Sequence, residues 1–302
     1  AAEADDTVLV ARVTSADGSL LAAIVNYACH PTTLAWQNTL LSPDFPGAMR
    51  EVIENATEAP CVFLQGASGD LGPRDGFVGD VEIADRNGRQ LGYAALAVFE
   101  SLPPPLTRFT YTGPVVSGAT LGTWAHVPLA ETDLDRLKTW QQRRWTIDLA
   151  YRADLPTLEQ TKSEQQGWLE REEQARTAGQ TQEASDCRAM VERMTRRLTR
   201  LKDLPPGPSF PFPVTLWRMG AAFWLAVEAE LYKHFQIALR QRFAGTPIVL
   251  ATLTNSSRPS YLPTADVYGK GIYQESIAVL APGCLEKLLQ EIGEQIQCWI
   301  RS

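Results

Sequence analysis

Short apolar runs that alternate with amphipathic helical patterns are the feature that most constrains the fold of this chain. Helical patterns occupy residues 46–56, 85–102 and 230–243. Strands that alternate with helices predict an α/β fold with some parallel pairing. We therefore expect a single mixed-sheet domain with flanking helices over residues 1–302. The predicted strands are the runs TVLVARV (7–13), LLAAIVNYA (20–28), PCVFLQ (60–65), AAFWLAVEA (221–229) and TPIVLATL (246–253).

Residues 131–203 depart from this pattern because they combine dense charge with helical spacing. The segment holds 14 of the 28 basic and 14 of the 35 acidic residues, so it is neutral within a chain of net charge −7. Val191, Met194 and Leu198 recur at the spacing of one helix face. We predict an inserted, charged helical hairpin or small bundle, ended by the five prolines of LPPGPSFPFP (204–213). A solvated arm, an assembly element and a lid are the alternatives for its role.

The overall composition excludes several classes of protein. An acidic pI near 5.2 argues against nucleic-acid binding, which needs a basic face. No apolar run reaches the ~20 residues that a transmembrane helix needs. The start AAEADDT lacks the basic and apolar parts of a signal peptide. Five scattered cysteines without a C-x-x-C pair predict buried free thiols, and secreted, periplasmic and cytoplasmic locations all stay open.

Polar residues lie where the first predicted strands end. In VNYACHPTTL the strand stops at His30, because Pro31 cannot donate to a sheet ladder. Open α/β sheets bind ligands at this end of their strands, although a core histidine bonded to a carbonyl is an alternative. The next strand leads into QGASGDLGPRDGF (65–77), whose glycines allow positive φ and close approach to a ligand. Ser68, Asp70 and Arg74 add polar groups there, and Ser68 is alternatively a turn hydroxyl.

A carboxylate and three phenols follow the later strands. Glu230 is predicted to open a helix, where the helix dipole alone would explain an acidic residue. The polar loop 254–275 contains Tyr261, Tyr268 and Tyr273. A histidine, a carboxylate and a phenol at separate strand ends are nitrogen and oxygen ligands that suit a catalytic zinc with an open position.

The order of these segments resembles the neutral ceramidase family, and most closely its bacterial members without the immunoglobulin-like domain. The resemblance covers most of the chain outside residues 131–203. It implies hydrolysis of the amide of N-acyl sphingoid bases with one zinc ion, held here by His30, Glu230 and Tyr261. It also implies that Tyr273, twelve residues after Tyr261, is a second active-site tyrosine. The matching segments are NYACHPTTL, LQGASGDLGPRDG, ADRNGRQLG, the junction at Glu230 and SYLPTADVYGKGIYQE.

Two departures from the family pattern matter. The family serine is replaced by Gly72 in GDLGPR, and Ser68, four residues earlier, is an imperfect substitute. A zinc-activated water attacks an amide without any serine. The first zinc histidine of the family also has no counterpart, since His126 and His234 lack its context and are interpreted as loop and helix-surface residues. We therefore expect an N-terminal companion segment or a longer polypeptide to supply that histidine.

The sequence thus predicts a zinc-dependent amide hydrolase that acts on an N-acyl lipid or related amide. Tyr273 and the loop residues Gly69, Asp70, Gly72 and Arg74 would contact the substrate or its oxyanion. The alternative is a non-catalytic binding or assembly module that keeps the scaffold and uses the helical insertion for partners, among them a second copy of the chain in a homo-oligomer. The zinc content of the purified protein distinguishes the two, while acyl length, head group and oligomeric state stay open.

Overall fold

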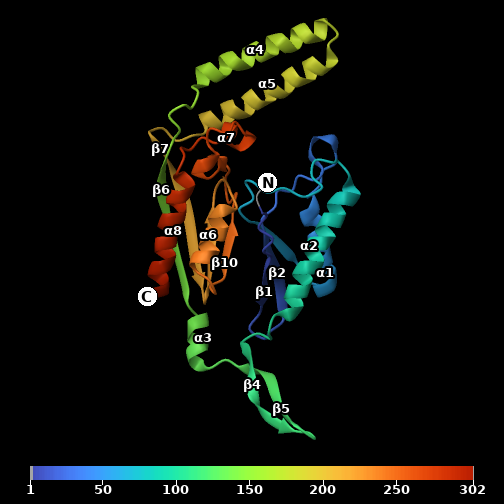
Figure 1. The fold of residues 1–302 in the computed structure, drawn as a ribbon, viewed down its shortest axis with the longest axis vertical. Coiled ribbons are helices and arrows are strands. Elements are labelled where there is room, and N and C mark those ends of the chain that lie inside the picture. Colours follow the sequence, from blue (N-terminus) through green and yellow to red (C-terminus); the bar gives the residue numbers. More distant parts are fainter. Residues whose placement is uncertain (1–2, 302) are drawn as a thin grey trace. The chain divides into compact units, whose positions relative to one another are not determined.

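The computed structural model describes residues 3–301 and only the backbone of Gln37. It combines helices with several small sheets, which confirms the predicted α/β class (Figure 1). The helices are α1 (Phe45–Thr57), α2 (Val81–Ser101), α3 (Glu131–Leu137), α4 (Leu158–Thr177), α5 (Thr181–Lys202), α6 (His234–Arg242), α7 (Tyr273–Ile277) and α8 (Cys284–Arg301). The strands are β1 (Leu9–Thr14), β2 (Leu20–Tyr27), β3 (Cys61–Gln65), β4 (Thr107–Val116), β5 (Thr120–Pro128), β6 (Trp140–Ala150), β7 (Ser209–Met219), β8 (Ala222–Val227), β9 (Glu230–Leu231), β10 (Ile248–Ala251) and β11 (Tyr261–Leu262).

Within residues 3–301 the strands form four sheets, which contain both parallel and antiparallel pairs. In the order β1-β2-β3, the first pair is antiparallel and the second is parallel. The second sheet has the order β10-β8-β7-β6, with β10 parallel to β8. Two-stranded sheets join β9 to β11 in parallel and β4 to β5 in antiparallel orientation. No helix among the described residues is both long and apolar enough to cross a membrane.

Two compact units make up the chain. The first comprises Ala1–Arg144, Thr215–Val227 and Lys233–Thr252. The second comprises Trp145–Val214, Glu228–Tyr232 and Leu253–Ser302. The single domain expected over residues 1–302 stays a prediction.

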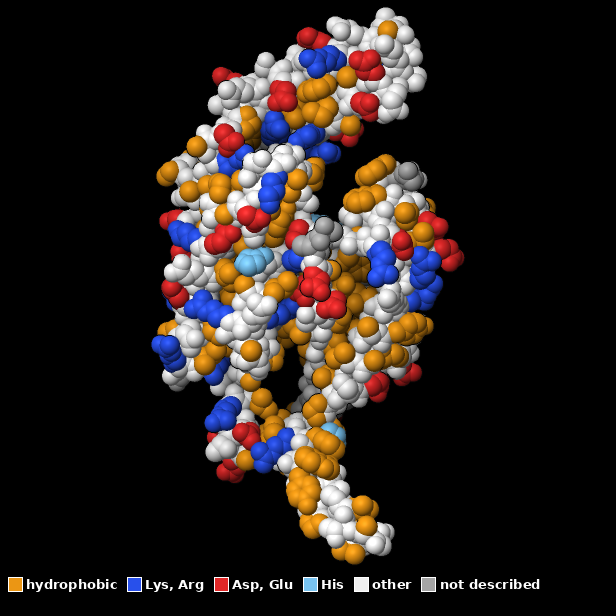
Figure 2. All heavy atoms as spheres, in the orientation of Figure 1, with side chains coloured by type: hydrophobic (Ala, Val, Ile, Leu, Met, Phe, Trp, Pro, Cys, Tyr) orange, Lys and Arg blue, Asp and Glu red, His pale blue; other side chains and the backbone are white. Residues whose placement is uncertain are grey.

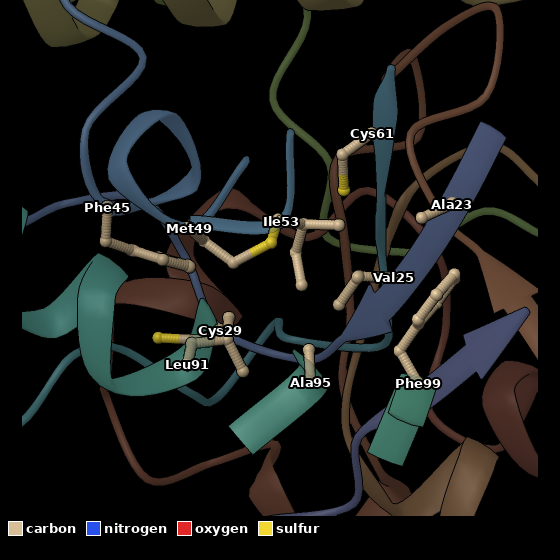
Figure 3. Close-up of a cluster of buried hydrophobic side chains, with 10 residues drawn as sticks. All are labelled: Ala23, Val25, Cys29, Phe45, Met49, Ile53, Cys61, Leu91, Ala95 and Phe99. Atoms are coloured by element: carbon tan, nitrogen blue, oxygen red, sulfur yellow. The ribbon is translucent and has the colours of Figure 1, made fainter. Parts of the chain in front are cut away.

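Helices α1 and α2 cover the β1-β2-β3 sheet of the first unit (Figure 1). Asp44 begins α1 by accepting a hydrogen bond from the Phe45 amide at 2.7 Å, which satisfies one of the amides at the helix start. The two helices approach closely at Gly88, where an added Cβ would lie 2.3 Å from the Phe45 carbonyl oxygen. Side chains from both helices and the sheet then form one buried cluster: Ala23, Val25, Cys29, Phe45, Met49, Ile53, Cys61, Leu91, Ala95 and Phe99 (Figure 3).

The helical hairpin predicted within residues 131–203 covers fewer residues than expected. Helices α4 and α5 form it, and a capping box between Thr157 and Gln160 starts α4 (Figure 1). Residues 140–150 are a strand, β6, instead of a helix. Buried and exposed side chains alternate here, with Ile147 and Leu149 fully buried between exposed neighbours, and this alternation is typical of a strand with one buried face.

A second correction concerns Glu230, which does not open a helix. It lies in the two-residue strand β9, and α6 begins only at His234. Pairing with β11 supplies backbone partners here, because the Glu230 amide donates to the Ser260 carbonyl at 2.9 Å. A long-range strand contact thus overrides the local helical pattern.

Candidate functional site

Glu230 and Tyr261 face each other across the parallel pair of β9 and β11. They are register partners, and the residues that precede them, Ala229 and Ser260, are both buried with φ of 71° and 57°. Left-handed φ in residues other than glycine is energetically unfavourable and concentrates at functional sites. The backbone therefore holds this carboxylate and this phenol together by two strained junctions.

The Tyr261 phenol is protonated and hydrogen-bonded to the Glu230 carboxylate. Burial raises the pKa of Tyr261 most, and the charge and hydrogen bond of Glu230 raise it further. The Tyr273 ring packs edge-on against Tyr261, with centroids 6.0 Å apart and planes at 73°. Thus three of the predicted site residues meet within the second unit. Two oxygen ligands held this way fit a cation, whose charge would reverse the effect that Glu230 has on the phenol.

Arg200 is a member of this neighbourhood that sequence reasoning missed. It lies in the last turn of α5, within electrostatic range of Glu230 and Tyr273. Burial lowers the pKa of its guanidinium, while these two groups raise it. Its signal in the sequence is the stretch 193–202, which has five basic and no acidic residues inside a segment that is neutral as a whole.

His30 lies just beyond β2 in the first unit. Its amide and its ring Nδ1 both lie near the Leu71 carbonyl oxygen, at 3.0 and 3.1 Å. A carbonyl only accepts, so Nδ1 carries the proton and the lone pair of the neutral ring is on Nε2. Metal-binding histidines commonly use this arrangement, in which a backbone carbonyl fixes the tautomer.

The loop 65–77 is held by contacts within the loop and by contacts to residues at the start of α6. Ser68 is buried, and its Oγ accepts a hydrogen bond from Gln65 Nε2 at 2.6 Å, which is the environment of a turn hydroxyl. Asp70 pairs with Lys233, Nζ to Oδ2, at 2.7 Å. The expected positive φ is absent at Gly66, Gly69 and Gly72 within the described residues. Gly66 is instead needed for packing, since an added Cβ would lie 2.9 Å from Gln236 Oε1 and 3.1 Å from the Ala28 Cβ.

Arg74 lies apart from the buried residues of this loop. It is exposed and lines a cavity of about 540 Å³ in the first unit, together with Arg86 and Asn87. The Asn87 Nδ2 atom is buried without a hydrogen-bond partner among the described residues. Both polar residues and apolar side chains such as Phe45 and Leu91 line this cavity.

The remaining candidate residues have structural surroundings. Tyr268 Oη donates to the Leu280 carbonyl at 2.7 Å. His126 lies in β5 with its ring 4.9 Å from that of Phe109, and His234 is the first residue of α6. Across residues 3–301, no group of three or more His, Cys, Asp or Glu side chains is arranged to hold a metal. A tyrosine ligand does not belong to these residue types.

Comparison with solved structures shows a ceramidase-like fold. A neutral ceramidase from Pseudomonas aeruginosa has a TM-score of 0.54 and 14% identity, over 95% of this chain and 45% of that chain. A ceramidase complexed with C2 has a TM-score of 0.54 and 16% identity, over 94% of this chain and 46% of that chain. The chain thus spans less than half the length of either structure. No family profile and no curated protein matches the sequence.

Proposed function

We propose that this chain is the scaffold of a zinc-dependent amide hydrolase related to neutral ceramidase. The observation that supports this most directly is the register of Glu230 and Tyr261, with Tyr273 packed beside them. Glu230 lies in β9 and Tyr261 in β11, and each strand is only two residues long, too short to be stable alone. Short strands that follow strained residues and carry a carboxylate and a phenol are typical of a functional site and not of a structural core.

His30, Glu230 and Tyr261 would hold the zinc ion. The donor set is chemically suitable: a carboxylate, a phenol that is hydrogen-bonded to that carboxylate, and a histidine whose tautomer leaves the lone pair on Nε2. A bound zinc polarises an amide carbonyl and lowers the pKa of a coordinated water. Loss of the phenol proton would accompany metal binding, because ligands bind in their deprotonated form.

Tyr273 would donate a hydrogen bond to the oxyanion that forms on the carbonyl oxygen. Its ring contact with Tyr261 keeps the phenol close to the proposed ligands. A donor that is already in position stabilises developing charge without reorganisation during the reaction. The loop residues Gly69, Asp70, Gly72 and Arg74 are proposed to contact the substrate, with Ser68 as a support within the loop.

Zinc content tests the proposal. The wild-type chain should bind about one zinc per molecule, measured by elemental analysis after dialysis. His30→Ala and Tyr261→Phe should lose most of it, whereas Tyr268→Phe, whose hydroxyl bonds a backbone carbonyl, should keep it. Tyr273→Phe should keep zinc and lose turnover of an N-acyl amide. A wild-type chain that folds but binds no zinc would favour the alternative, a binding or assembly module.

A further inference from the structure

A cavity of the second unit is lined by three arginines. It measures about 340 Å³ and lies between the C-terminal half of α5, the end of α7 and the segment after β6. Arg197 and Arg200 come from α5, and Arg152 comes from the segment after β6. Three guanidinium groups from two elements therefore meet at one hollow of the surface, where Asp154 is the acidic residue among those that line it.

Two of these arginines have carboxylate partners. Arg152 pairs with Asp154, Nη2 to Oδ2, at 2.7 Å and donates to the Glu275 carbonyl at 2.6 Å. Arg197 Nη1 lies 2.9 Å from Glu164 Oε2. The Arg200 side chain, in contrast, makes no hydrogen bond or ion pair to any described residue, and Glu230 is a carboxylate whose charge reaches it from farther away. A half-buried guanidinium without an acceptor is costly to desolvate unless a ligand supplies one.

The dipole of α5 accounts for part of this charge. Cations in the last turn stabilise the C-terminal end of a helix, which explains Arg200 and Lys202. It does not explain the convergence of Arg152 from another element. Nor does it explain why residues 193–202 contain no acidic residue in a chain of net charge −7. Figure 2 shows Lys and Arg side chains gathered beside the base of the α4–α5 hairpin.

The cavity adjoins the residues that we assign to the reaction. Ser276 lines it and bonds the Tyr273 carbonyl within the same short helix, α7. Arg200 interacts with both Glu230 and Tyr273. A substrate whose amide lies at these residues would therefore place a neighbouring group in the cavity.

We propose that this cavity binds an oxyanion, a carboxylate or phosphate, that the amide substrate carries. The proposal rests on the proposed function and makes its substrate an anionic N-acyl compound. Arg200 is the specificity-determining residue, because a planar guanidinium can bind a carboxylate or phosphate through two parallel hydrogen bonds. Arg152 and Arg197, held by their own carboxylate partners, frame the cavity.

Binding measurements on the metal-free protein test this without any need for turnover. N-octanoylglycine is the probe, because it has both an amide and a carboxylate, and isothermal titration calorimetry in EDTA gives its Kd. Its methyl ester should bind at least tenfold more weakly. Arg200→Gln should weaken the binding of N-octanoylglycine at least tenfold. Arg200→Lys should weaken it less, because lysine keeps the positive charge but cannot donate two parallel hydrogen bonds from a planar group. Arg188→Gln, on the same helix but outside this cavity, is the matched control and should change nothing.

Three outcomes would overturn the proposal. Equal affinity for the acid and its ester, or for the wild type and Arg200→Gln, would exclude an oxyanion site. Octanoate or inorganic phosphate binding as tightly as N-octanoylglycine would show an anion site that ignores the amide. The proposed function fails separately, by absence of zinc from the wild-type chain, so the two failures are distinguishable.

Discussion

Asp70 accepts two hydrogen bonds from Lys233. Its Oδ1 accepts the Lys233 amide at 2.8 Å, and its Oδ2 accepts Nζ at 2.7 Å. Both side chains are mostly buried, with 22% and 13% of their surface exposed. The contact ties the glycine-rich loop to the start of α6, just beyond the strand that bears Glu230. Asp70, proposed from the sequence to contact a substrate, is thus also a structural link.

We predict that Asp70→Ala destabilises the protein by roughly 2–4 kcal/mol. The substitution leaves an ammonium group largely buried without its partner, and both hydrogen bonds are lost. Asp75→Ala is the control, because its pair with Arg86 is exposed and should contribute less than ~1 kcal/mol. Urea unfolding monitored by circular dichroism measures both. Equal stability of the two variants would contradict the prediction.

Two helical glycines should respond to alanine in opposite directions. At Gly88 the added methyl would lie 2.3 Å from the Phe45 carbonyl oxygen and 2.7 Å from the Ala48 Cβ, so α1 and α2 must separate. Gly88→Ala should cost about 1–3 kcal/mol. Gly167 lies in α4 with no atom within 4 Å of an added Cβ, so Gly167→Ala should stabilise by roughly 0.5–1 kcal/mol. Thermal unfolding of both variants gives the two signs.

Local signals predicted helices α1 and α2 well, whereas α8 was not predicted. Pro46 and the apolar spacing of residues 46–56 indicate a helix, and α1 extends over Phe45–Thr57. Helix α2 begins four residues before its predicted start at 85, because the Asp80 side chain caps it by accepting from the Glu82 amide. Such caps and periodic faces are local, so sequence alone carries them.

The site depends on information that is not local. Residues 230–243 have a helical pattern, but residues 230–231 form a strand because a partner 31 positions downstream, Tyr261, pairs with Glu230. The role of β6 was missed because its charges suggested the helical hairpin, although Ile147 and Leu149 alternate with polar residues. Arg200 was missed for a related reason: its proximity to Glu230 comes from the packing of α5 in the folded chain.

Stability should fall as pH rises above about 9. Burial raises the pKa of the Cys29 thiol to about 12 and that of Cys61 to about 11. A group whose pKa is raised by folding contributes fully to the stability of the folded protein at pH values below its unfolded pKa, which is 9.0 for these thiols. This contribution is lost as the pH rises from 9.0 toward the pKa of the folded state. The loss should approach ~2 kcal/mol per thiol by pH 11. Cys29→Ala/Cys61→Ala should show a flatter decline of unfolding free energy between pH 8.5 and 10.5.

The exposed thiol Cys298 gives a separate check on this burial. Among the five free cysteines it alone is exposed, while Cys29, Cys61, Cys187 and Cys284 are buried. Brief treatment of the native protein with iodoacetamide should therefore add one label, located at Cys298 by peptide mass spectrometry. In denaturant all five should react. Rapid labelling of Cys29 in the native protein would contradict the buried core of the first unit.

The β4–β5 hairpin should tolerate polar substitutions at its aromatic residues. Phe109 and Trp124 are 61% and 60% exposed, and Figure 2 shows hydrophobic side chains over this hairpin. Trp124→Thr removes a stacked contact with Phe109 at 6.0 Å but empties no core, so it should cost less than ~1 kcal/mol. Phe99→Ala, in the buried cluster beneath α2, should cost about 3–5 kcal/mol. Comparable losses for both variants would show that the hairpin face is covered.

Arg258 should be essential to the junction that precedes Glu230. Its Nη2 lies 2.9 Å from Glu228 Oε1, its guanidinium lies over the Phe210 ring at 5.3 Å, and Glu228 is only 5% exposed. The other Glu228 oxygen, Oε2, is buried without a partner among the described residues, so Arg258 alone compensates this carboxylate. Arg258→Ala should therefore cost about 3–5 kcal/mol by leaving a buried charge unpaired.

The reverse change should be milder. Glu228→Gln keeps the shape and a hydrogen-bond acceptor for Arg258, and 42% of the Arg258 side chain is exposed, so water can solvate the guanidinium that loses its counterion. We expect a cost of less than ~1.5 kcal/mol, and the double variant should be more stable than Arg258→Ala alone because the unpaired charge is gone. Chemical unfolding of the three variants measures this cycle. If Arg258→Ala and the double variant were equally stable, the buried Glu228 charge would not be what Arg258 compensates.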